Sequence, residues 1–183
     1  MRRGVAAAAG LMTGVLVAGY LAVGAGLGAG LGEAAAAKAA DVLKGRIIIS
    51  EKAFPSRFAS DGAMVAHMKK VNKSELVCDK EGVWEFYYMA FFAKPLDDVQ
   101  VTVNLYDLTT GGEFIMGADQ YTSARGERIL ASYFKFTREE IPSNHKVSIV
   151  IVHKGSRLAT TEVKMRDDRK FKGKVDFGDD EAK

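Results

Sequence analysis

Residues 83–106, with the sequence VWEFYYMAFFAKPLDDVQVTVNLY, decide the fold. The first part of this stretch is apolar on both faces apart from one glutamate, as in a central strand that is covered on both sides. Pro95 ends that strand, and Asp97 and Asp98 make a turn. Residues 99–106 then alternate apolar and polar side chains, which is typical of a half-buried strand. The stretch therefore predicts two consecutive strands of a β fold.

The same two-residue period recurs on both sides of this stretch and predicts about seven strands in all. Glycine at residues 111 and 112 tolerates the positive φ of a hairpin turn between two of them. Short strands at spacings of roughly 10–15 residues predict a mainly β fold, an antiparallel immunoglobulin-like β-sandwich. The usual disulfide is absent, because Cys78 is the single cysteine. The expected strands cover residues 46–50, 83–93, 99–106, 113–121, 128–137, 146–153 and 158–165.

One short helix is expected as an insertion after the first strand, at residues 61–71. Its apolar residues fall at i, i+1, i+4 and i+7, one stripe of a helix, and Ser60 or Asp61 is the expected N-cap. Lysines on the opposite side should face water, with contact to anionic lipid as the alternative. The apolar stripe is Met64, Val65, Met68 and Val71, and the lysines are Lys69, Lys70 and Lys73.

The chain begins with an apolar run, residues 4–32, that contains no charged residue. We expect this N-terminal hydrophobic helix to meet a membrane, in one of two ways. Arg2 and Arg3 with an Ala-x-Ala site in residues 34–40 fit a cleaved signal peptide. Alternatively the helix stays uncut as an anchor, since about 20 apolar residues span a bilayer core. Residues 34–43 are expected to form a helical hinge between this run and the domain.

Three glycines at four-residue spacing would leave a bare groove on the N-terminal helix, where a second membrane helix could pack closely. They are Gly24, Gly28 and Gly32. An alanine- and glycine-rich composition without such a contact explains the same spacing. The chain is accordingly divided into a signal peptide or membrane anchor (1–40), a β-sandwich domain (41–165) and a charged, mostly disordered tail (166–183).

The sequence contains no catalytic motif: no nucleophile elbow, phosphate loop, dinucleotide fingerprint or H-E-x-x-H pair. The net charge of +3, from 26 basic and 23 acidic residues, gives no electrostatic footprint for nucleic acid. His145 and His153 share one strand face, but about 27 Å of extended chain separates them, so they cannot share a metal ion. Cys78 is expected to be a small buried apolar residue. We therefore expect no catalytic residues, no metal and no cofactor.

Four aromatic residues are candidate contacts for a partner protein. Tyr87 and Phe91 would form an exposed patch if one face of their strand were uncovered, although a core position is the expected one. In the tail, Phe171 and Phe177 alternate with charged residues closely enough to form a short added strand or a docking motif.

Three hypotheses for function follow. In the leading one the chain is a non-enzymatic cell-envelope protein, exported to the periplasm, anchored in the membrane facing it, or secreted, with a β-sandwich that binds another envelope protein or is structural. The second is a small exported hydrolase or ligand-binding carrier that uses His145 or His153 with loop acids. In the third, the glycine-rich helix oligomerises in the membrane and the sandwich is its head.

Overall fold

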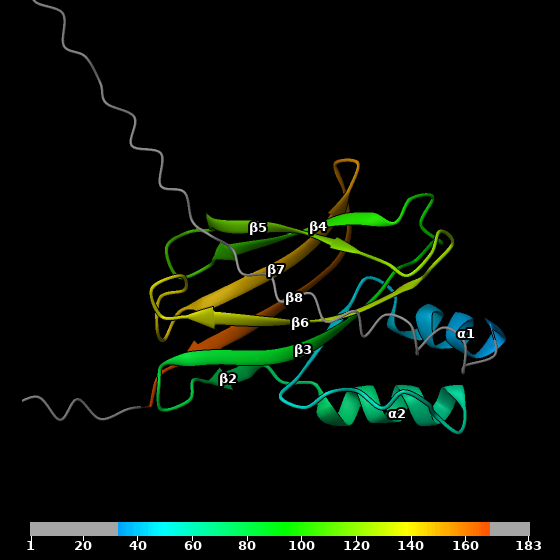
Figure 1. The fold of residues 1–183 in the computed structure, drawn as a ribbon, viewed down its shortest axis with the longest axis horizontal. Helices are drawn as coiled ribbons and strands as arrows, with labels where there is room; N and C mark the ends of the chain where they lie inside the picture. Colours follow the sequence, from blue (N-terminus) through cyan, green and yellow to red (C-terminus); the bar gives the residue numbers. More distant parts are fainter. Residues whose placement is uncertain (1–32, 169–183) are drawn as a thin grey trace, which may run out of the picture.

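A computed structural model of the chain describes residues 33–168 (Figure 1). This part of the chain is mainly β, with eight strands and two helices. None of its helices has the length and apolar character needed to cross a membrane. The expected apolar run and the expected tail after residue 168 lie outside the described residues, and so do five candidate contacts: Gly24, Gly28, Gly32, Phe171 and Phe177.

The two helices and the seven strands expected from the sequence are present, and one strand, β2, was not predicted. At three residues β2 is too short to show a period, and it pairs in parallel with the distant β8. In chain order the elements are α1 (Glu33–Leu43), β1 (Ile47–Ser50), α2 (Asp61–Val71), β2 (Glu75–Val77), β3 (Val83–Phe91), β4 (Gln100–Asp107), β5 (Glu113–Tyr121), β6 (Ile129–Thr137), β7 (Lys146–His153) and β8 (Ser156–Arg166).

The strands form two sheets that share one core (Figure 1). A three-stranded sheet has the order β1-β3-β6, and a five-stranded sheet has the order β2-β8-β7-β4-β5. Every strand pair named here is antiparallel except β2–β8, so the expectation of an antiparallel fold is wrong at that edge. Arg46, the residue before β1, forms an isolated parallel bridge with Thr160 of β8, which joins the two sheets along one side.

β3 is a central strand, and its second half, from Tyr88 to Phe91, is covered on both faces, as its sequence predicted. Its inward residues, including Trp84, Phe86 and Tyr88, lie in the core between the sheets. The Trp84 indole N–H donates to the carbonyl of Arg166 across the core, at 3.1 Å. On the other face, Phe91 lies under the helices and is completely buried. β3 therefore connects the main core to a second, smaller one.

The second core lies between the two helices and the outer face of the three-stranded sheet (Figure 1). α2 contributes two methionines of the predicted stripe, and its N-cap is Ser60, whose Oγ accepts from the Ala63 amide at 3.2 Å. Because α1 contributes Ala39 and Ala40, it crosses the domain boundary expected after residue 40. The buried members of this core are Ala39, Ala40, Leu43, Ile48, Met64, Met68, Met89 and Phe91.

Candidate functional site

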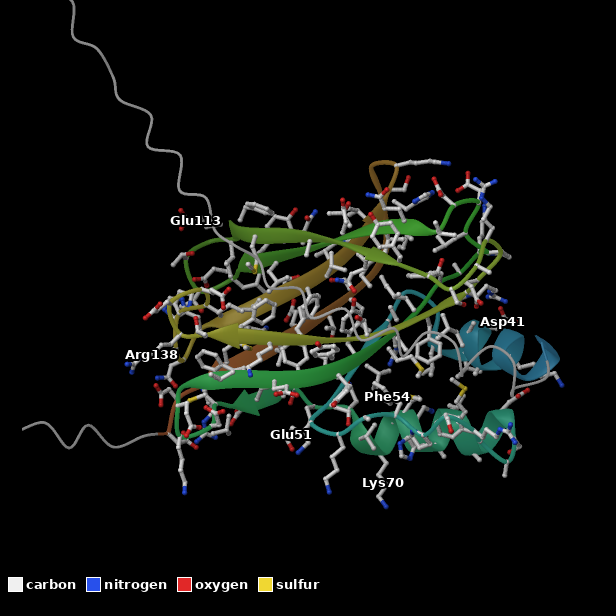
Figure 2. The ribbon with its side chains drawn as sticks, in the orientation of Figure 1. Asp41, Glu51, Phe54, Lys70, Glu113 and Arg138 are labelled. Carbon is white, nitrogen blue, oxygen red and sulfur yellow. The ribbon has the colours of Figure 1, made fainter. Side chains whose placement is uncertain are left out.

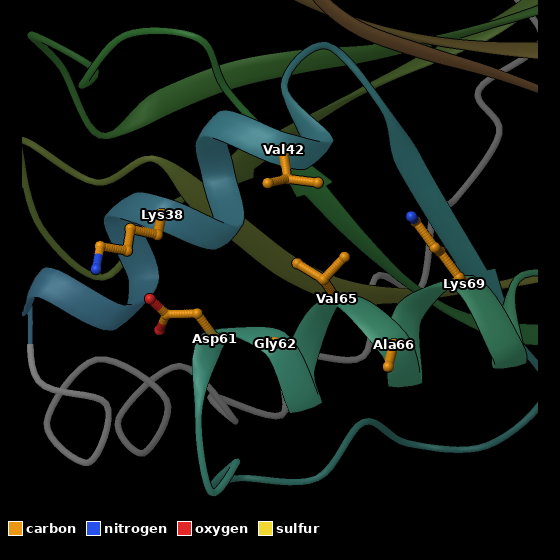
Figure 3. A pocket seen from close by; sticks show the side chains of 7 residues that line it. All are labelled: Lys38, Val42, Asp61, Gly62, Val65, Ala66 and Lys69. Carbon is orange, nitrogen blue, oxygen red and sulfur yellow. The ribbon is translucent and has the colours of Figure 1, made fainter.

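A shallow groove lies between α1 and α2. Its volume is about 400 Å³. Figure 3 shows Val42 and Val65 facing each other across it, with Lys38 and Asp61 at one end and Lys69 at the other. Gly62 and Ala66 complete the lining. The groove thus has an apolar floor and a mainly basic rim.

Helix geometry explains why this groove is open. Met64 and Met68 of α2 turn into the second core, so the residues beside them on the helix face outward. The small residues Gly62 and Ala66 leave the space above them empty. On α1, Val42 is 58% exposed, whereas its neighbour Leu43 is buried. An apolar side chain is thus left in water next to a core.

Arg128 at the start of β6 fixes α1 to the sheets. Its guanidinium donates to the carboxylate of Asp41 on α1 at 2.6 Å. The same side chain donates to the carbonyls of Phe92 and Ala93, which follow β3, at 3.3 and 3.1 Å. The Asp41 side chain is 66% exposed, so the ion pair by itself stabilises little, and the packing of α1 in the second core adds to it. α1 is thus part of the folded domain and is not a hinge.

Charge is distributed unevenly between the helical region and the rest of the domain. Residues 33–73, which contain both helices, carry eight basic and four acidic residues, a net charge of +4. Residues 74–168 carry eleven basic and fifteen acidic residues, a net charge of −4. Lys70 on α2 points away from the sheets, whereas Glu113 lies at the opposite end of the domain (Figure 2). The domain has a positive side, and the groove lies on it.

Each of two histidines is paired with an aspartate. The Nδ1 atom of His145 lies 2.6 Å from Oδ2 of Asp107, which also accepts from the Thr109 amide. The Nε2 atom of His153 lies 2.7 Å from Oδ1 of Asp97. The pairs are at opposite ends of β7, so the histidines do not share a site.

The pKa values of both aspartates follow from these contacts. Hydrogen bonds from Lys154 and His153 lower the pKa of Asp97 to about 2. Burial by itself raises the pKa of Asp107, but hydrogen bonds from His145 and the Thr109 amide outweigh it, and the net shift is downward. Both carboxylates are therefore held ionised as structural acceptors.

The histidines proposed for a hydrolytic site each lie beside one acid, in two separate pairs: His145 with Asp107 and His153 with Asp97. Asp97 and Asp107 lie at opposite ends of β4, and Glu140 accepts from the Thr137 amide at 2.8 Å. Among residues 33–168, no three His, Cys, Asp or Glu side chains are grouped as metal ligands would be. The two histidine–aspartate pairs join loops to strand ends.

The outer face of β5 is a second exposed surface, which sequence reasoning missed. Phe114 is 56% exposed and Tyr121 is 49% exposed. The Phe114 ring meets Tyr106 edge-on, with 5.7 Å between centroids. A Cβ atom at Gly117 would come within 2.7 Å of the Asn104 carboxamide oxygen, so a larger residue there would require the Asn104 side chain to move. β5 pairs with β4 on one side and ends the order of its sheet.

The candidate partner contacts on β3 have different environments. Phe91 is fully buried beneath the helices, the core position expected for it, so it is not part of an exposed patch. Tyr87 is half-buried, and its ring lies 6.1 Å from that of Tyr133 on β6. Cys78 is buried, as expected for a small apolar residue.

No family model matches the chain, and comparison with curated proteins gives no match. Among solved structures, the chain is similar to part of a β-glucosidase from Listeria innocua in complex with glucose, with 14% identity over 51% of this chain and 15% of that one (TM-score 0.32). A putative β-galactosidase from Bacteroides fragilis shares 9% identity over 66% and 16% (TM-score 0.32). The DNA glycosylase AlkC of Pseudomonas fluorescens shares 14% over 51% and 28% (TM-score 0.26). At these TM-scores, none of the three bears on the activity of this chain.

Proposed function

We propose that this chain is a non-enzymatic cell-envelope protein whose β domain is exported and held at the membrane by the apolar run of residues 4–32. One observation carries the proposal. The described part of α1, Glu33–Leu43, follows the run in sequence, and it is packed into the domain through Ala39, Ala40 and Leu43. A membrane helix joined to α1 would thus be coupled to a rigid domain.

The packing of α1 favours an uncut anchor over a cleaved signal peptide. The Ala-x-Ala sites lie within residues 34–40, inside α1. A cut at the last of these sites, after Ala39, would remove the fully buried Ala39 from the second core. Loss of buried apolar groups leaves a cavity and lowers stability. Each of these cuts would also remove the first turn of α1 or more, whereas an uncut chain keeps the whole helix.

We also propose that the two sheets form an immunoglobulin-like sandwich. Leaving out β2, the other strands can be lettered in chain order A, B, C, C′, E, F and G. The two sheet orders then become A-B-E and G-F-C-C′. This order supports the assignment, since immunoglobulin-type domains place C, F and G in one sheet and can extend it by C′.

The partner is proposed to be another envelope protein that adds an extended segment to the edge of β5. Three features support this. β5 is nine residues long, it has β4 as its neighbour on one side, and Phe114 and Tyr121 are exposed at its two ends. An open strand edge supplies backbone donors and acceptors, and flanking aromatic residues supply apolar contacts.

Membrane attachment and export are tested together by cysteine labelling in intact bacterial cells. The variant Lys80→Cys in a Cys78→Ala background carries a single exposed thiol, away from the proposed partner edge of β5. We expect the protein in the membrane fraction and a membrane-impermeant maleimide to label it before lysis. Protein recovered from the cytosol, and labelled only after lysis, would contradict the proposal.

A further inference from the structure

We propose that the groove face of α1 and α2 rests on an anionic lipid surface, with Val42 and Val65 at the level of the lipid headgroups and Lys38 and Lys69 on lipid phosphates. This inference rests on the proposed membrane attachment and adds the orientation of the domain to it. Three observations carry it: the place where the apolar run ends, the charge of this side, and the shape of the groove.

The groove lies close to the point where the chain would leave the membrane. The described part of α1 follows the apolar run in sequence, and a helix rises about 1.5 Å per residue. Lys38 and Val42 therefore lie within about 15 Å of that point along the helix axis. Because Arg128 and the second core hold α1 on the sheets, the α1–α2 face stays beside the membrane.

The charge of this side suits an anionic surface. Residues 33–73 carry a net charge of +4, and the remainder of the described domain carries −4. A negatively charged lipid surface attracts the positive side and repels the negative one, which favours the orientation with the α1–α2 face toward the membrane. Two of the four acids in this region are already paired: Asp41 with Arg128, and Glu51 with Lys73. Asp61 lies in the groove and opposes binding, but Lys38 and Lys69 outnumber it there.

The shape of the groove suits lipid better than a second copy of the chain. An open apolar floor with lysines at its rim allows the lysine stems to lie along apolar groups while the ammonium groups reach phosphates. A symmetric dimer through the same face would bring two positive sides together, which like-charge repulsion disfavours. An anionic lipid surface has the complementary charge.

The test uses the full-length chain reconstituted into vesicles of phosphatidylcholine alone or mixed with anionic phosphatidylglycerol. A polarity-sensitive fluorophore is attached at Val42→Cys in a Cys78→Ala background. The matched control probe is Phe114→Cys, since Val42 and Phe114 are 58% and 56% exposed. We expect a blue shift and quenching by spin-labelled lipid at position 42 in the anionic vesicles, and neither change at position 114.

Charge variants show whether the lysines cause the shift. The triple variant Lys38→Gln, Lys69→Gln and Lys70→Gln should lose the anionic-specific blue shift at position 42. The control triple variant Lys80→Gln, Lys135→Gln and Lys164→Gln removes the same charge from exposed sites elsewhere and should keep it. Circular dichroism confirms that both variants fold.

The outcomes separate this inference from the proposed function. Protein that floats with vesicles but shows no blue shift at position 42 overturns the docking and leaves the anchor intact. An equal shift in both vesicle types that grows with protein concentration also overturns it, in favour of a second copy. Protein that floats with neither vesicle type overturns both proposals.

Discussion

Tyr88 places a phenol hydroxyl in the core between the sheets, without a hydrogen-bond partner among the described residues. The Ser132 hydroxyl, opposite Tyr88 in the β3–β6 register, donates to Gln120 instead. Burial raises the pKa of Tyr88, and the nearby Ser132 opposes this only in part. Its ring stacks on Phe134 at 4.9 Å. The ring therefore contributes to packing, whereas the hydroxyl costs free energy.

The variant Tyr88→Phe should accordingly keep or raise the free energy of unfolding, by up to about 1 kcal/mol, because it removes an unsatisfied polar group and keeps the ring. Urea unfolding measures this. In the contrasting variant Trp84→Phe, loss of the indole and its hydrogen bond to Arg166 should lower stability by about 1 kcal/mol or more. A clear loss of stability in Tyr88→Phe would mean that the hydroxyl has a stabilising contact.

The lowered pKa of Asp107 predicts that the free energy of unfolding depends on pH. Its pKa is lower in the folded chain than in the unfolded one, so the ionised carboxylate stabilises the fold above about pH 4, the usual aspartate value. That contribution is lost as the pH falls through the folded-state pKa. Between pH 6 and pH 2, urea unfolding of Asp107→Asn should change less with pH than that of the unaltered chain. Parallel pH profiles would contradict this assignment.

At this scale, the sequence was informative about core positions and uninformative about polar contacts. The sequence of β3 is apolar on both faces apart from Glu85, and this pattern predicted a strand covered on both faces. Asp41 and Arg128 are 87 residues apart in the chain, and no local pattern relates them. Likewise, the pairing of His145 with Asp107 depends on the order of strands in the sheet.

At the scale of elements, α1 differs most from the expectation, because it packs into the second core instead of forming a hinge. The sequence EAAAAKAADVL predicts a helix, but its alanines are so uniform that no buried stripe can be read from it. The structure buries Ala39, Ala40 and Leu43 and leaves Val42 exposed. α2 has a clear methionine stripe and was predicted with its bounds, but the surface that it covers follows only from the tertiary structure.

Docking of α1 is tested by placing a carboxylate on either side of the helix. In Ala40→Glu the charge would be buried in the second core, so α1 should detach, with a loss of about 2 kcal/mol or more, as for a buried polar group without a partner. Hydrogen exchange should then show lost protection in residues 33–43 while β3, β4 and β7 stay protected.

The control, Val42→Glu, changes an exposed position of the same helix and should alter stability by less than about 0.5 kcal/mol. Unchanged exchange in Ala40→Glu would show that α1 does not depend on this core.

At the scale of the molecule, the two sheets, the helical layer and the charge distribution together define an orientation. The sequence predicted seven strands and hence a mainly β fold, because the two-residue period of a strand can be read from neighbouring residues alone. The assignment of strands to sheets, the parallel β2–β8 pair and the placement of both helices on one sheet depend on contacts between distant segments. The groove could not be predicted either, because it forms only where α1 and α2 come together in the tertiary structure.

The central claim is that the apolar run remains joined to a packed α1, so that the domain is anchored at the membrane in a fixed orientation. The most direct test is the intact mass of the protein extracted from the membrane fraction of cells that express it. We expect the mass of a chain that retains residues 4–32, close to the 19.8 kDa of the full sequence. A soluble exported form whose mass begins within residues 34–41 would contradict the claim.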